Sequence, residues 1–121
     1  MKRSATTRAI EEYTAAIKID PEYVLAYNNR GVVYFKSGDY VKAMKDFNRV
    51  LTLDERFKDA YINRGLVYKR LGDYTQAIEN YNIAIALDPG WRKSYISRGV
   101  AYGEEKKFEL ALKDFNRAVE I

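Results

Sequence analysis

The chain has 121 residues, of which 47% are hydrophobic and 31% are charged, and its formal net charge at pH 7 is +4. It contains no cysteine and no histidine, which excludes disulfides, thiol chemistry, and the commonest general base and metal ligand of proteins. No apolar run approaches the ~20 residues of a membrane span, and no secretory signal follows the basic N-terminal residues. We therefore expect a single cytoplasmic domain that does not enter a membrane.

Hydrophobic spacing predicts seven helices. The first, over residues 5–19, has apolar residues at i, i+3, i+4 and i+7 and ends before Pro21, because proline cannot continue a helix. Three helix pairs are predicted after it, over residues 24–37 with 40–53, 58–71 with 74–87, and 92–105 with 108–121.

A period of 34 residues relates these helices to one another. Gly31, Gly65 and Gly99 recur at this spacing on the first helix of each pair. Columns of alanine and of aromatic residues recur on the second helices, at Ala9, Ala43, Ala77 and Ala111 and at Tyr13, Phe47, Tyr81 and Phe115. A repeat of this length predicts a helical solenoid. By register, residues 1–23 are the second-helix half of a repeat, and full repeats follow over 24–57, 58–91 and 92–121, the last without its closing turn.

The turn between the two helices of the last pair departs from the pattern. In the first two pairs, Gly38-Asp39 and Gly72-Asp73 provide a residue suited to a left-handed backbone and a helix cap. Lys106-Lys107 replaces them in the third pair. We expect this change to cost about 1–2 kcal/mol locally.

The middle repeat resembles the tetratricopeptide repeat family. The residues that carry the resemblance are Tyr61, Gly65, Tyr68, Gly72-Asp73-Tyr74, Ala77, Tyr81, Ala84 and Asp88-Pro89. The resemblance covers essentially the whole chain and implies an all-α, right-handed superhelix whose first helices line a concave groove. It also implies a non-catalytic scaffold that binds proteins or peptides, although a fold does not specify the partner.

An arginine precedes each repeat glycine, where the family usually has leucine. These residues are Arg30, Arg64 and Arg98. A charge at such a position needs a partner. The residues that recur in step on the second helices are Asp46, Asn80 and Asp114. We predict that each arginine pairs with this column and is structural.

The groove predicted from the family geometry is lined by the first helices, on the side opposite the glycine and tyrosine stripe. Its peptide-binding residues are Asn28, Asn29, Val32, Phe35, Lys36, Ile62, Asn63, Leu66, Lys69, Arg70, Lys93, Ser97 and Val100. The cations of this wall, counted against Asp59 and Glu104, leave a charge of +2. Such a wall suits a peptide of apolar and acidic character.

Asn29, Asn63 and Ser97 lie 34 residues apart within the predicted wall. An asparagine amide can donate to a peptide carbonyl and accept from a peptide N–H at once. Some superhelical members of the family hold an extended backbone with such asparagines, which supports the same role here.

Other members of the family clamp the carboxylate end of heat-shock chaperones with basic residues and asparagines. The five clamp positions fall on Asn28, Val32, Asn63, Lys93 and Ser97, and only Asn63 and Lys93 have the required residue type. We therefore predict that the chain lacks this clamp.

The sequence also bears on self-association, RNA binding and catalysis. Self-association is an alternative, because Leu110, Leu112, Val119 and Ile121 crowd a last helix that no polar cap follows. RNA binding by helical repeats is less favoured, because the basic residues are mixed with acids rather than gathered in a stripe. Catalysis is not expected: adjacent acidic pairs diverge on a helix, and no phosphate loop or calcium loop is present. We expect no cofactor and no metal.

Overall fold

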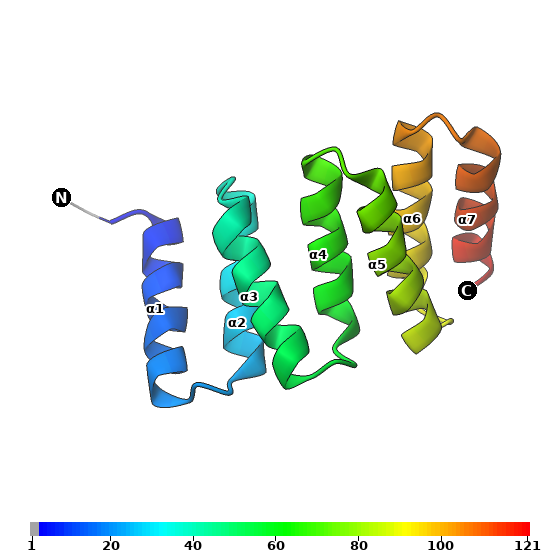
Figure 1. The fold of residues 1–121 in the computed structure, drawn as a ribbon. Coiled ribbons are helices and arrows are strands. Elements are labelled where there is room, and N and C mark those ends of the chain that lie inside the picture. The colour runs from blue at the N-terminus through cyan, green and yellow to red at the C-terminus, as the bar shows by residue number, and fades with distance from the viewer. Residues whose placement is uncertain (1–2) are drawn as a thin grey trace. The chain divides into compact units, whose positions relative to one another are not determined.

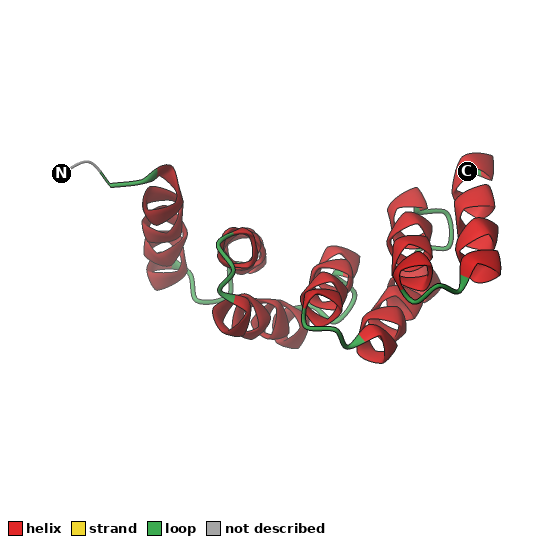
Figure 2. Cartoon of the chain, turned by 90° about the horizontal axis from the view of Figure 1, so that it is seen from above, coloured by secondary structure: helices red, strands yellow, loops and turns green. Residues whose placement is uncertain are grey.

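The computed structural model describes residues 3–121, and these residues form seven helices and no strand (Figure 1). The helices are α1 (Ala5–Ile19), α2 (Val24–Lys36), α3 (Tyr40–Leu53), α4 (Lys58–Arg70), α5 (Tyr74–Leu87), α6 (Arg92–Glu104) and α7 (Phe108–Glu120). Each begins and ends within one residue of its predicted range. Short loops connect them (Figure 2). The all-α prediction is confirmed.

The chain divides into two compact units, Met1–Ala60 and Tyr61–Ile121. In the first unit, Tyr27 of α2, Val50 of α3 and Ala60 at the start of α4 form a buried cluster, and Ile17 of α1 packs against it. The core of the second unit is the set Ile62, Ala77, Tyr81, Ala84 and Ala101. The single-domain prediction stays a prediction. Among the described residues, no helix combines the length and the apolar character needed to cross a bilayer.

The repeat glycines let the two helices of a pair approach closely. A Cβ atom on Gly31 would lie 2.6 Å from the ring of Phe47, and one on Gly65 would lie 2.4 Å from the ring of Tyr81. Real Cβ atoms do not come so close to a ring. The aromatic residue on the second helix can therefore occupy its position only if the facing residue on the first helix is glycine. The recurrence of glycine and an aromatic residue every 34 residues is therefore explained by this contact between the two helices of each pair.

The turn before α7 is strained where its sequence departs from the repeat. Gly38 and Gly72 have φ angles of 81° and 84°, and Lys106 holds the same left-handed conformation at 63°. The Asp39 side chain accepts a hydrogen bond from the backbone N–H of Lys42, whereas Lys107 makes no side-chain cap bond to α7. A side chain at positive φ and a missing cap both cost free energy.

Restoring the repeat residues in this turn is expected to stabilise the protein. The variant Lys106→Gly/Lys107→Asp should raise the free energy of unfolding by about 1–2 kcal/mol, because glycine tolerates positive φ and aspartate caps the helix. Urea unfolding followed by circular dichroism measures the change. The control Lys106→Ala/Lys107→Ala removes the same two charges and adds neither feature. An equal gain in the control would show that charge, not backbone geometry, limits this turn.

Candidate functional site

The predicted binding residues of the second unit lie on α4 and α6. These helices meet near their C-terminal ends, where the Lys69 Nζ atom lies 3.5 Å from the Glu104 Oε1 atom. The Lys69 side chain is only 12% exposed, against 44% for Glu104. Because Lys69 is engaged with Glu104, its charge contributes little to attracting a ligand.

An apolar strip with a cationic end runs along α6. Lys93, Ile96 and Val100 follow one another at i, i+3 and i+7, a spacing that places their side chains on one face of the helix. Ile96 is 42% exposed and Val100 is 37% exposed. The Lys93 Nζ atom lies 5.9 Å from the centre of the Trp91 ring, and Ser97 is half-buried beside the strip. On α4, Asn63 and Leu66 are half-buried and Arg70 is exposed. Together these side chains form what we call the α4–α6 face.

Not every predicted wall residue reaches the surface. Ile62 is 0% exposed and belongs to the core of the second unit with Ala101 of α6, so we leave it out of the candidate surface. Asn28 on α2 is only 7% exposed. The prediction used the side of one helix opposite the glycine and tyrosine stripe, and that pattern does not include packing against other helices, such as the contact of Ile62 with the cluster that contains Ala101.

The first unit presents its predicted residues on α2 alone. Asn29 and Lys36 are exposed, whereas Val32 and Phe35 are half-buried. The Phe35 ring lies 5.6 Å from the ring of Tyr40, centre to centre, so it partly packs within the pair. On α2, the exposed predicted residues are therefore polar, and the apolar ones, Val32 and Phe35, are only partly accessible.

The predicted pairing of the arginine column is confirmed. The Nε and Nη2 atoms of Arg30 donate to the two carboxylate oxygens of Asp46 at 2.8 and 2.7 Å, and Nη1 donates to Thr14 Oγ1 at 3.1 Å. Asp46 is only 4% exposed. The hydrogen bond to Asp46 raises the pKa of Arg30, although burial acts in the opposite direction.

The same arrangement recurs in the other two pairs. Arg98 donates to both carboxylate oxygens of Asp114 at 2.9 and 2.7 Å, and to Asn82 Oδ1 at 2.9 Å. In the middle pair, the Nε atom of Arg64 donates to Asn80 Oδ1 at 2.8 Å. These arginines fasten the first helix of each pair to the second.

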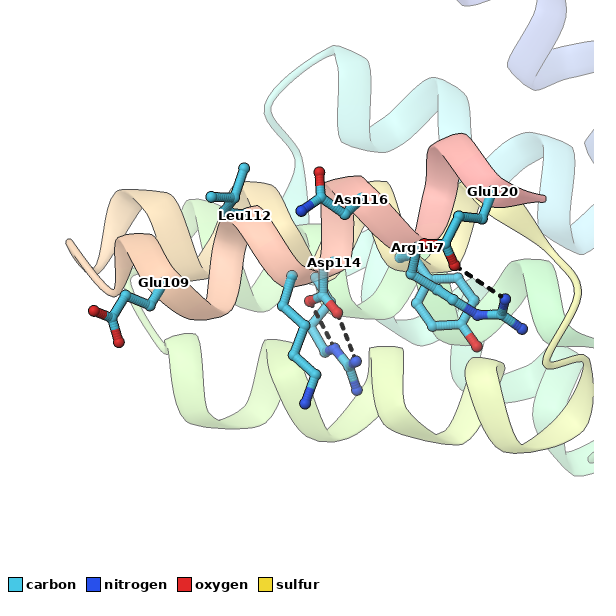
Figure 3. A pocket seen from close by; sticks show the side chains of 9 residues that line it. Glu109, Leu112, Asp114, Asn116, Arg117 and Glu120 are labelled. Atoms are coloured by element: carbon cyan, nitrogen blue, oxygen red, sulfur yellow. Dashed lines mark hydrogen bonds and ion pairs between the residues drawn. The ribbon is translucent and has the colours of Figure 1, made fainter.

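Two pockets lie beside the arginine–aspartate pairs, and sequence reasoning did not predict them. The α2–α3 pocket has a volume of about 530 Å³ and the α6–α7 pocket about 590 Å³. Figure 3 shows the second, with Glu109 and Glu120 toward opposite ends of α7 and Asp114 between them. The sequence pattern that could have indicated the α2–α3 pocket is the i, i+3, i+7 spacing of the cations Lys42, Lys45 and Arg49. Among residues 3–121, no cluster of acidic side chains could hold a metal ion.

Models of tetratricopeptide repeats match the chain from end to end. A model described as TPR repeat matches residues 1–38, and models described as Tetratricopeptide repeat match residues 24–57, 59–90 and 93–121. No curated protein sequence matches the chain significantly.

Solved structures similar to this chain include MamA and two peptide-bound TPR domains. Two crystal structures of MamA are 31% identical over 95% of this chain, with TM-scores of 0.84 and 0.83. The chain spans about two thirds of their length, 67% and 63%. The second TPR of Spaghetti (RPAP3), bound to the HSP90 peptide SRMEEVD, is 27% identical over 79% of this chain and 89% of its own, with a TM-score of 0.73. The first TPR, bound to the same peptide, is 32% identical over 80% of this chain and 79% of its own, with a TM-score of 0.76.

Proposed function

Because this chain belongs to the tetratricopeptide repeat family, we propose that it is a protein-interaction scaffold whose α4–α6 face binds an extended segment of a partner protein. The observation that carries the proposal is the exposure of Ile96 and Val100 on α6, 42% and 37%, in line with Lys93. Exposed apolar side chains in this position provide surface that a bound peptide can bury. The Lys93 cation can orient the peptide by attracting an acidic side chain.

The partner segment proposed for this face combines apolar and acidic residues. The exposed cation at the end of the apolar strip is Lys93. Arg70 is also exposed on α4, and Lys69 is paired with Glu104. The peptide bound by the similar Spaghetti domains, SRMEEVD, has this mixed character. The Asn63 amide, with two donor hydrogens and an acceptor oxygen, can bond a peptide backbone in addition to an internal partner.

A chaperone tail is not the partner we propose. Asn28, Val32 and Ser97 lack the residue types that the five-position clamp uses. The absence of that clamp, like the cytoplasmic location, stays a prediction. The family is generally a non-catalytic interaction module, and we propose no chemistry.

Selection of peptides from a random library on the wild-type chain, followed by affinity measurement on variants, tests the α4–α6 face. We expect enriched peptides to lose about tenfold or more in affinity for Asn63→Ala/Val100→Asp, because the variant removes a backbone contact and places a charge in the apolar strip. The matched control is Asn116→Ala/Leu112→Asp on α7, where both residues are exposed. Failure to enrich any peptide, or equal losses in the two variants, would contradict the proposal.

Self-association through α7 is a second candidate, favoured by one observation. An apolar stripe on its outer side is largely exposed, with Phe108 at 67%, Leu112 at 60% and Val119 at 83%. The equivalent residues Tyr74 and Ile78 of α5 pack against the core beneath α6. The α7 stripe therefore has the chemistry to accept a helix of a second copy. Sedimentation equilibrium at rising concentration tests this, and a monomer at every concentration would contradict it.

A further inference from the structure

The α2–α3 pocket of the first unit carries an excess of positive charge. It lies beside the Arg30–Asp46 pair, and three more cations, Lys42, Lys45 and Arg49, line it from α3. Asp46 is the one carboxylate among the residues that line it, and it is bonded to Arg30. Four cations against one carboxylate leave a formal charge of +3.

The described residues outside the pocket do little to neutralise this charge. Lys42 lies 3.9 Å from Asp39, but the two side chains are 62% and 41% exposed, so water screens the pair. Neither Lys45 nor Arg49 has a carboxylate partner within residues 3–121, and both are exposed. The positive field of the pocket is therefore available to a ligand.

The α6–α7 pocket has the same position in its repeat and no net charge. Lys113 and Arg117 stand 68 residues after Lys45 and Arg49. The cations that line it are Arg98, Lys113 and Arg117, and the carboxylates are Glu109, Asp114 and Glu120. The Arg117 Nη1 atom lies 3.8 Å from the Glu120 Oε2 atom (Figure 3). Equal numbers of each sign leave a formal charge of zero. The excess charge is thus a property of the α2–α3 pocket and not of the repeat.

The tyrosines of the α2–α3 pocket favour carboxylates over nucleobases as ligands. The Arg30 guanidinium lies 5.8 Å from the ring centres of both Tyr27 and Tyr34. Each ring also has a second cation nearby. The Lys42 Nζ atom lies 5.5 Å from the centre of the Tyr34 ring, and the Arg49 guanidinium lies 5.9 Å from the centre of the Tyr27 ring. Single-stranded nucleic acids are held by bases that stack on open aromatic faces, and these faces are occupied by cations.

We propose that the α2–α3 pocket is a docking site for an acidic segment of a partner protein, whose carboxylates pair with Lys42, Lys45 and Arg49. These cations at i, i+3 and i+7 extend over roughly 10 Å of α3, given the ~1.5 Å rise per helical residue. Acidic side chains on one side of an extended segment repeat about every 7 Å, so two of them fit the row. No lining residue of the pocket is among the predicted groove residues, so this site is independent of the α4–α6 face.

A labelled acidic peptide tests the site directly. The probe is a fluorescein-labelled peptide of alternating glutamate and serine, titrated with the full chain at low and at physiological salt. The test variant is Lys45→Gln/Arg49→Gln, and the matched control is Lys113→Gln/Arg117→Gln, which changes the net charge equally at the same register. We expect the test variant to lose about five- to tenfold in affinity and the control less than about twofold, because only the α2–α3 pocket has an excess of positive charge.

Three results would overturn the proposal. Equal losses in the two variants would mean that the peptide responds to the net charge of the chain. Retained affinity in the test variant would place the peptide elsewhere. Tighter binding of a uridine decamer than of the acidic peptide, lost in the test variant, would assign the pocket to RNA. Circular dichroism of each variant, compared with wild type, confirms that the α2–α3 pair is still folded.

Discussion

Replacing Arg98 by leucine is expected to destabilise the protein by about 3–5 kcal/mol, because the change strands a buried carboxylate. Asp114 is 4% exposed, and both of its oxygens accept hydrogen bonds from Arg98. Leucine keeps the apolar stem of the side chain but provides no donor. Chemical denaturation of the purified variant, compared with wild type, measures the loss of unfolding free energy.

Two controls separate the stranded charge from lost packing. The double variant Arg98→Leu/Asp114→Leu removes both charges and should recover most of the stability, since a buried ion pair contributes little compared with apolar residues of similar volume. Arg64→Leu should cost less than Arg98→Leu, because its partner Asn80 is neutral. If Arg64→Leu costs as much as Arg98→Leu, the carboxylate is not the cause.

The helices and the arginine pairs could be predicted because each depends on register along the chain. A proline or a turn sets each helix end locally, and residues 16 apart within one hairpin, such as Arg30 and Asp46, repeat at the same spacing in every pair. Ile62 is buried instead in a cluster with Ala101 of α6, which lies 39 residues further along the sequence. The residue pattern of α4 alone does not predict this contact.

The charge difference between the two pockets, like the burial of Ile62, depends on how the helices pack against one another. Glu109 and Glu120 lie 11 residues apart on α7, and the sequence does not say that both line one pocket with Arg98 of α6. Once the helices are placed, the register identifies their counterparts as Val41 and Thr52, which are uncharged. The sequence therefore contains the charge difference, and the structure identifies the pocket to which it applies.

The close helix crossing in the second unit predicts a graded series of glycine-to-alanine effects. Gly65→Ala is expected to destabilise by about 3 kcal/mol, because its Cβ would lie 2.4 Å from the ring of Tyr81, which is 0% exposed. Gly99→Ala should cost less. Its Cβ would lie 2.7 Å from Phe115, but that residue is 37% exposed and its ring can move outward.

Gly103→Ala is the control for this series, since it lies on the same helix as Gly99. Its Cβ would meet only the Cβ of Ala111 at 4.0 Å, an ordinary contact. This variant should be neutral or stabilising by up to about 1 kcal/mol, because alanine favours a helix more than glycine does. Thermal and urea unfolding of Gly65→Ala, Gly99→Ala and Gly103→Ala measure how strongly each variant changes the free energy of unfolding. If Gly103→Ala destabilises as much as Gly65→Ala, the repeat glycines are retained for a reason other than the helix crossing. If Gly99→Ala equals Gly65→Ala, the exposed ring of Phe115 is held as firmly as the buried ring of Tyr81.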